Sequence, residues 1–108
     1  MKVSELAETE GFKAIALPEP GREIEGCYIG DLLSWVMGRA KEGDAWLTIM
    51  SNINIVAVAS LADTAAVILT EGVTVDEKIT ETAAAKGVNV FTSNKPSYET
   101  AVEISELI

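Results

Sequence analysis

The second half of the chain alternates short β-branched apolar runs with longer segments of helical pattern, and no other feature constrains the fold as strongly. The apolar runs with strand character lie at Ala45–Met50, Thr64–Leu69 and Val88–Phe91. The helical patterns that follow them lie at Ile53–Ala62, Val75–Lys86 and Ser97–Ile108. Short apolar strands separated by helices are typical of a parallel sheet covered on both faces. The alternation therefore predicts a three-layer α/β/α domain with a mostly parallel sheet.

The first half of the chain adds two more strands and two more helices to this plan. Strand patterns lie at Phe12–Ala16 and Arg22–Ile29, separated by a Pro- and Gly-containing loop. Ser4 is suited to cap a short helix over Glu5–Glu10, and Leu32–Ala40 has the pattern of a second helix. No linker, repeat or low-complexity segment divides the sequence. We expect one domain over residues 1–108 with about five strands, the last three parallel in βαβαβ succession.

Two local signals fix the ends of the helix predicted at Val75–Lys86. Thr74 and Glu77 have the spacing of a capping box, in which Thr74 accepts a helical amide and Glu77 reaches back. Gly87 follows Lys86, where a left-handed residue commonly ends a helix.

The charge of the chain excludes some kinds of partner. The sequence holds 17 acidic and 8 basic residues, for a net charge of −9. Such a field repels polyanions, so we expect neither nucleic-acid binding nor attachment to anionic membranes. No apolar run approaches the roughly 18 residues needed to span a bilayer. The first residues lack an apolar signal core, which predicts a cytoplasmic protein. We also expect the domain to stand alone.

Histidine is absent, and this removes several kinds of chemistry at once. A His general base, Ser-His and Cys-His nucleophiles and the usual zinc sites are excluded. The single cysteine, Cys27, lies in a strand pattern and is expected to be a small buried hydrophobe. Asp31, Asp44 and Asp63 lie singly near element ends, where carboxylates usually cap or are solvated, so we expect no metal and no other cofactor. No phosphate-binding loop of the kinase type is present.

The chain resembles the DRTGG domain family over nearly all of its length. The segments that carry the resemblance are Gly21–Gly26, Tyr28–Met37, Ala66–Gly72 and Ala84–Phe91. The C-terminal half is also similar to the N-terminal domain of HPr kinase/phosphorylase, in which an apolar strand, a Gly-containing turn and a helix ending in Gly recur in this order. The resemblance implies that fold and a regulatory or ligand-sensing module. It also implies frequent fusion to domains such as CBS pairs, frequent dimerisation and no established catalytic activity of the domain alone.

The chain departs from the family pattern at both parts of the motif that gives the family its name. Ser51-Asn52-Ile53-Asn54 stands where the Asp-Arg would fall, and Thr70-Glu71-Gly72 stands in place of Thr-Gly-Gly. Any contact that the family's Arg makes cannot be made in the same way here.

Small polar residues follow each of the last three predicted strands. Because ligands of open parallel sheets gather beyond the carboxyl ends of the strands, these residues are the predicted ligand-binding site. They are Ser51, Asn52, Asn54, Thr70, Glu71, Gly72, Thr92 and Ser93. The alternative is that they only cap helices. Lys95 and Arg22 are the bases expected to assist an anion there, whereas Glu71 opposes one, so a triphosphate fits poorly.

The segment Ile53–Ala62 is apolar almost all the way round a helix. A helix of this kind is buried on more than one side, either by a neighbouring helix or by a second subunit. Large apolar residues on the preceding helix could extend such a contact, although any of them could instead belong to the core. The predicted interface residues are Trp35, Met37, Ile55 and Val58.

Two hypotheses about function follow. The first is a non-catalytic regulatory module that acts as a homodimer, binds a small metabolite or nucleotide at the strand ends, and contacts an unidentified protein partner. The alternative is a small enzyme that uses carboxylates or Cys27 in the same crevice. The absence of histidine and of any catalytic motif favours the first.

Overall fold

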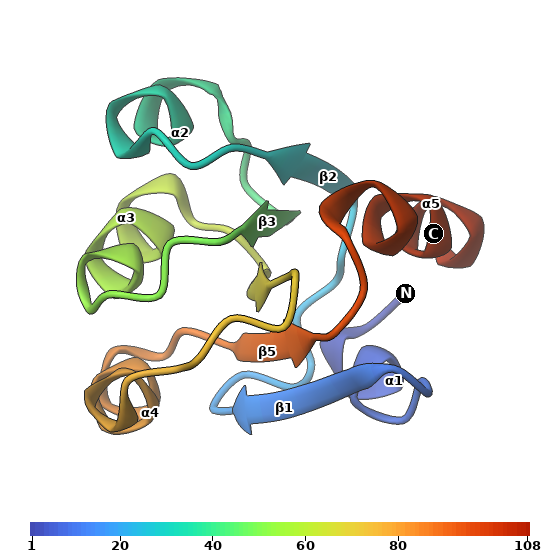
Figure 1. Ribbon diagram of the computed structural model, residues 1–108, viewed down its shortest axis with the longest axis horizontal. Coiled ribbons are helices and arrows are strands. Elements are labelled where there is room, and N and C mark those ends of the chain that lie inside the picture. The colour runs from blue at the N-terminus through green and yellow to red at the C-terminus, as the bar shows by residue number, and fades with distance from the viewer.

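The computed structural model describes residues 1–108 as five strands and five helices arranged around one sheet (Figure 1). The strands are β1 (Phe12–Ala16), β2 (Gly26–Ile29), β3 (Asp44–Thr48), β4 (Ala66–Leu69) and β5 (Val90–Ser93). The helices are α1 (Val3–Ala7), α2 (Leu33–Arg39), α3 (Asn54–Ala62), α4 (Glu77–Lys86) and α5 (Ser97–Leu107). None of these helices combines the length and the apolar character needed to span a lipid bilayer.

The sheet has the strand order β1-β5-β4-β3-β2. Strands β2 to β5 are mutually parallel, and β3, β4 and β5 are neighbours linked by α3 and α4. Only β1 is antiparallel, and it pairs with β5 at the edge. The predicted fold class is confirmed, including the βαβαβ succession of the last three strands.

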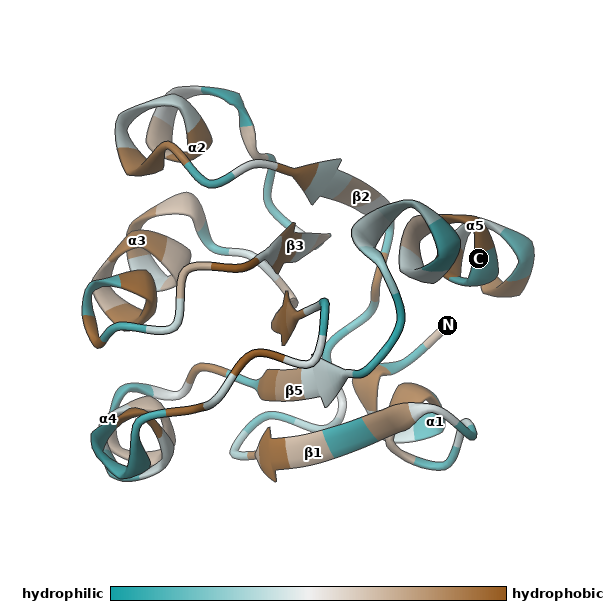
Figure 2. Cartoon of the chain, viewed as in Figure 1, coloured by the Kyte–Doolittle hydropathy of each residue, from teal (hydrophilic) through white to brown (hydrophobic).

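Helices cover both faces of the sheet: α2, α3 and α4 lie on one side, and α1 and α5 on the other (Figure 1). Successive residues of a strand point to opposite faces, so Trp46 and Val67 enter one core while Leu47 and Ile68 enter the other. The central strand β4, between β3 and β5, is apolar and buried throughout (Figure 2). A strand buried on both faces needs this composition, so the unbroken apolar run in the sequence predicted it.

Two elements near the N-terminus begin at different residues from those predicted. Strand β2 starts at Gly26, and the residues before it form only an isolated bridge between Glu23 and Lys2. Helix α1 starts at Val3, so Ser4 lies inside it and is not its N-cap. The Glu5 carboxylate accepts the Lys2 N–H at 3.1 Å and satisfies an amide at this helix end instead.

The predicted capping box of α4 is wrong, because the helix begins two residues later than expected. Its N-cap is Asp76, whose carboxylate accepts the Lys78 N–H at 2.9 Å. Thr74 lies before the helix. At the other end, Gly87 has a φ of 73° and caps the helix in the left-handed conformation, as predicted.

Helix α3 buries one broad face against the sheet between α2 and α4 (Figure 1). Its buried residues are Ile55, Val56, Val58 and Ala59. The outer face remains open, with Ile53 before the helix and Leu61 near its end both exposed. Because α2 and α4 lie on either side of α3, neighbouring helices provide the burial on more than one side that the sequence predicted, and the outer face stays open.

Candidate functional site at the carboxyl edge of the sheet

The turns that follow β3, β4 and β5 meet at one edge of the sheet, because these strands are parallel neighbours. The Glu71 N–H donates to Lys95 O at 2.9 Å and the Gly72 N–H donates to Ser93 O at 3.2 Å. On the other side, the Thr70 N–H donates to Thr48 O at 3.1 Å. The predicted Thr70–Gly72 turn is thus held between its two neighbours.

Thr70 and Ser93, two of the predicted ligand-binding residues, are buried and make their hydrogen bonds within the protein. Thr70 Oγ1 lies 2.6 Å from Ser97 Oγ, and Ser93 Oγ lies 3.1 Å from Thr100 Oγ1. Ser93 Oγ also accepts the Lys95 N–H at 3.2 Å. Both hydroxyls therefore hold the start of α5 against the sheet.

Glu71 is exposed but its carboxylate is also used internally. It accepts the Ser97 N–H at 2.8 Å and so caps the N-terminus of α5. The Glu71 backbone has a φ of 62°, and Gly72 after it has a φ of 67°. A carboxylate therefore stands at the helix amide that an incoming anion would otherwise approach.

The turn Ser51–Asn54 supports the capping alternative. Asn52 Oδ1 accepts the Asn54 N–H at 2.9 Å at the start of α3, and both asparagines are exposed. The preceding residues are fixed by Asp31, whose Oδ1 accepts Thr48 Oγ1–H at 2.8 Å and the Ile49 N–H at 2.9 Å. No group of three Cys, Asp or Glu side chains is arranged to hold a metal ion.

A polar hollow of about 440 Å³ lies at the end of β5, where β1 begins beside it. Its lining residues are Gly11, Phe12, Lys13, Thr92 and Asn94. Thr92 was predicted from the sequence. The β1 residues were not, because local patterns do not show that β1 runs antiparallel to β5 and so starts at this edge. Gly72 borders the same place, since a Cβ atom on it would lie 3.7 Å from Asn94 Oδ1.

Lysine side chains, not Arg22, supply the positive charge near this hollow. Lys13 lines it and forms no salt bridge. A Cβ atom on Gly11 would lie 4.0 Å from Lys95 Nζ, so Lys95 is adjacent. Its ammonium pairs with Glu103 at 2.6 Å, and this hydrogen bond raises the pKa of Lys95. Arg22 pairs with Asp63 at 2.8 Å, before β4 at the opposite edge, so it cannot assist an anion here.

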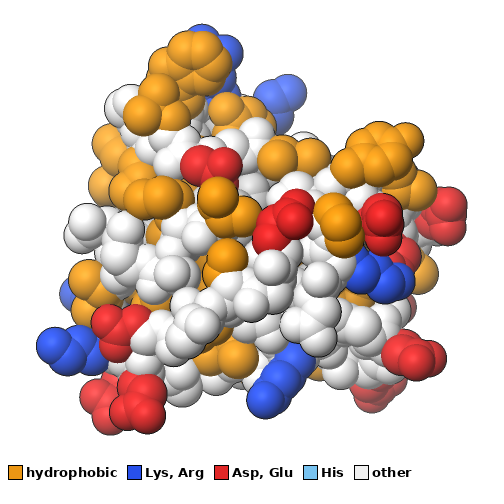
Figure 3. All heavy atoms as spheres, viewed as in Figure 1, with side chains coloured by type: hydrophobic (Ala, Val, Ile, Leu, Met, Phe, Trp, Pro, Cys, Tyr) orange, Lys and Arg blue, Asp and Glu red, His pale blue; other side chains and the backbone are white.

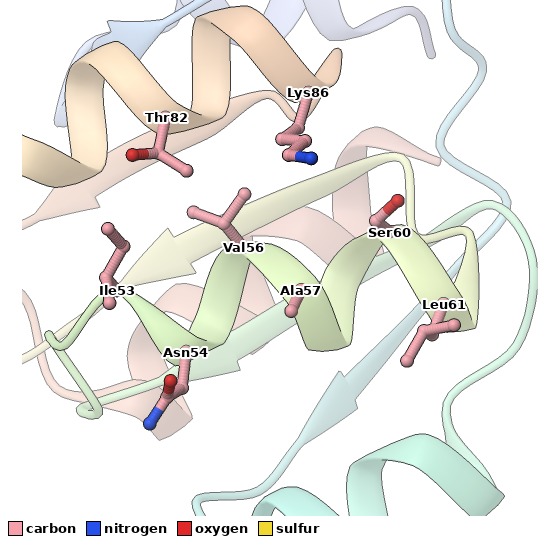
Figure 4. Close-up of a pocket in the computed structure, with 8 residues that line it drawn as sticks. All are labelled: Ile53, Asn54, Val56, Ala57, Ser60, Leu61, Thr82 and Lys86. Carbon is pink, nitrogen blue, oxygen red and sulfur yellow. The ribbon is translucent and has the colours of Figure 1, made fainter.

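A second hollow of about 430 Å³ lies between the outer faces of α3 and α4 and extends along α3 from Ile53 to Leu61 (Figure 4). Its floor and walls come mostly from α3 and are largely apolar, while Thr82 and Lys86 reach in from α4. The α3 side is formed by Ile53, Asn54, Val56, Ala57, Ser60 and Leu61.

The four predicted interface residues divide into two pairs. Trp35 and Met37 are exposed on α2, and the Arg39 guanidinium stacks 3.8 Å from the centre of the Trp35 ring. Ile55 and Val58 are buried in the core between α3 and the sheet. This second pair is not accessible to another chain, because its side chains point inward from α3.

Cys27 lies on β2, beside Ala45 of β3, and is half-buried. Burial, with a smaller contribution from the charge of Asp44, raises the pKa of its thiol from 9.0 to about 11. The thiol is therefore protonated at neutral pH, which makes it a poor nucleophile.

Comparison with known proteins agrees with this fold. The profile of the DRTGG domain family matches residues 23–107, so the chain belongs to the DRTGG domain family. Among solved structures it is similar to the CBS and DRTGG domains of the regulatory region of Clostridium perfringens pyrophosphatase, crystallised with the activator diadenosine tetraphosphate. The TM-score is 0.70 at 20% identity, over 94% of this chain and 44% of that one. No curated protein sequence matches the chain.

Proposed function

We propose that this DRTGG domain is a regulatory domain that senses a small metabolite or nucleotide and acts as a homodimer. The observation that carries the proposal is the polar hollow at the carboxyl edge, lined by Lys13, Thr92 and Asn94. Open parallel sheets bind ligands at this edge. Support also comes from the structurally similar pyrophosphatase region, which is regulatory and was crystallised with a nucleotide activator.

The charges around the hollow limit the kind of ligand that it would take. Lys13 has no acidic partner, whereas Lys95 is paired with Glu103 and Glu71 occupies the first amide of α5. The hollow therefore offers one free positive charge together with the hydroxyl of Thr92 and the amide of Asn94. This combination suits a ligand with hydrogen-bonding groups and a single negatively charged group better than it suits a triphosphate.

The same contacts favour sensing over catalysis. Asp31 and Glu71, the carboxylates at this edge described above, each accept a backbone N–H and so serve the fold. Cys27 is protonated and lies within β2. The alternative of a small enzyme in the same crevice would need a base or nucleophile other than these. We propose that the domain passes on its ligand-bound state through contacts with another chain.

A thermal-shift screen of the full chain against nucleotides, diadenosine tetraphosphate and common carboxylate and phosphate metabolites tests the proposal. A ligand at about 100 times its Kd stabilises by roughly 2.7 kcal/mol, which raises Tm by roughly 10 °C for a domain of this size. Amide shifts in NMR spectra should then map to the residues of the hollow. Lys13→Ala should abolish the shift in Tm, and Lys78→Ala, an exposed lysine on α4, should leave it unchanged.

Two results would contradict the proposal. The first is a hit that perturbs only amides of the Pro18–Arg22 loop at the opposite edge. The second is turnover of a bound compound, which would favour the enzyme alternative.

A further inference from the structure

The acidic residues of this chain are distributed unevenly among its helices. Helices α1, α4 and α5 each carry one or more glutamates, whereas α2 and α3 carry no acidic residue at all. The stretches 32–38 and 45–62, which contain nearly all of these two helices, have no charged residue. Because α2 and α3 pack side by side, they form one surface to which neither helix brings an acidic side chain, on a chain of net charge −9 (Figure 1). The one charged residue of the two helices is Arg39, which stacks on Trp35.

This surface, which we call the α2–α3 face, also holds most of the exposed large apolar side chains. They gather over α2 and along its side toward α3 in the space-filling view (Figure 3). The exposed residues of the α2–α3 face are Leu32, Trp35, Met37, Ile49, Ile53 and Leu61. Exposed apolar residues scattered singly are normal on a protein surface, whereas a group of six on neighbouring segments is typical of an interaction site.

The α2–α3 face has protruding side chains, and a hollow lies along its α3 border. Two copies of the face could therefore fit together. Trp35 and Leu61 project from the two helices, and the hollow between α3 and α4, which Thr82 and Lys86 border on the α4 side, lies beside them (Figure 4). A two-fold dimer uses the same patch on both subunits, so each copy must supply both features.

We propose that a second copy of this chain covers the α2–α3 face about a two-fold axis. The inference rests on the proposed homodimer and assigns its contact surface. A standard interface buries about 800 Å² on each partner, of which somewhat over half is apolar. The six exposed apolar side chains of the α2–α3 face would supply the apolar part of such a contact. Neither α2 nor α3 brings an acidic side chain to the contact, which limits the repulsion between two chains of charge −9.

Light scattering coupled to size exclusion, at tens of micromolar protein, tests the proposal with a matched pair of variants. Leu61 on α3 is 75% exposed and Tyr98 on α5 is 76% exposed, so neither substitution disturbs a core. We expect the wild-type chain and Tyr98→Glu to have a mass near twice the 11.5 kDa of one chain. We expect Leu61→Glu, and the double variant with Met37→Glu, to elute as folded monomers, with circular dichroism confirming the fold.

Acrylamide quenching of tryptophan fluorescence gives a second readout, which uses the wild-type protein and needs no substitution. Trp46 is fully buried, so quenching of the native protein reports on Trp35. Quenching should increase when the wild-type dimer is diluted to monomer.

The possible results separate the two proposals. If the wild type is a dimer but Leu61→Glu stays dimeric, or Trp35 stays fully quenchable in the dimer, the α2–α3 face is not the interface. The homodimer itself would still stand. A wild-type monomer overturns both, while ligand sensing is judged separately by the thermal-shift screen.

Discussion

The Glu71 carboxylate accepts the backbone N–H of Ser97 at 2.8 Å, and this contact joins the turn after β4 to the first residue of α5. Glu71 has a φ of 62°, a left-handed conformation that glycine adopts more readily than residues with a side chain. Two opposing effects therefore meet at one position. The backbone conformation would be relieved by glycine, and the helix cap would be lost with it.

Substitutions at Glu71 should separate these two effects. Glu71→Ala removes the cap and keeps the strained backbone, so we expect a loss of about 1–1.5 kcal/mol in the free energy of unfolding. Glu71→Gly removes both, and we expect it to lie within about 1 kcal/mol of the wild type and above the alanine variant. Urea denaturation measures both values. An alanine variant as stable as the glycine variant would show that the left-handed backbone carries no strain.

Asn89 should be among the polar residues on which stability depends most. It is buried, and its side-chain amide donates to Glu19 O at 2.8 Å and to Ala65 O at 2.9 Å while it accepts the Glu19 N–H at 2.9 Å. Asn89→Ala leaves these three backbone groups without their partner, so we expect a loss of about 3 kcal/mol in urea denaturation. Asn54→Ala, at an exposed asparagine, should change the value by no more than about 0.5 kcal/mol. Equal effects of the two substitutions would contradict this account.

The start of α4 allows a direct comparison between two residues that are both suited to cap a helix. Asp76→Ala should lower the free energy of unfolding by about 1 kcal/mol, because it removes the acceptor for the Lys78 N–H. Thr74→Ala should have almost no effect, since Thr74 makes no side-chain hydrogen bond and precedes the helix. Thermal unfolding of the two variants would decide the matter, and the reverse order would restore the capping box predicted from the sequence.

Cys27 should make stability depend on pH in the alkaline range. Because the pKa of the thiol is about 11 in the folded chain and 9.0 ordinarily, the folded chain keeps a proton that the unfolded chain loses between these values. The thiol's contribution is therefore complete below pH 9 and is lost as pH rises toward 11. Urea denaturation at pH 8 and pH 10 should show a steeper decline for the wild type than for Cys27→Ala.

A thiol reagent gives an independent check on the same group. At pH 8 the folded protein should react about a hundredfold more slowly than the urea-unfolded chain, as expected for a thiol pKa higher by about two. Rapid modification of the folded protein would contradict the assigned burial.

The sequence predicted the layers and the parallel strands because those features follow from local patterns, namely short apolar runs that alternate with helical segments. Ala66–Leu69 is apolar at every position, and only a strand buried on both faces requires this. The neighbour of β1 was not predictable in the same way. Pairing of Phe12 with Ser93 depends on the whole topology, and no pattern within β1 encodes it.

The sequence predicted which chain segments meet at the carboxyl edge of the sheet, but not the roles of their side chains. Thr70 and Ser93 do follow the strands expected to carry them, yet each hydroxyl points to α5. Residue type does not reveal this direction, since the same Thr or Ser can face a ligand or a helix. Lys13 went unnoticed because its strand joins the edge from the other end of the sequence.

The pairing of the first strand with the last has a consequence for how the chain is made. Phe12 and Ser93 are 81 positions apart, so β1 leaves the ribosome long before its partner exists. At typical elongation rates the delay is roughly 4–16 s, during which an apolar strand has no place in the sheet. Contacts between such distant positions also slow folding. The sheet can therefore be completed only once the last quarter of the chain has been synthesised. Until then the nascent domain is open to chaperones and to aggregation.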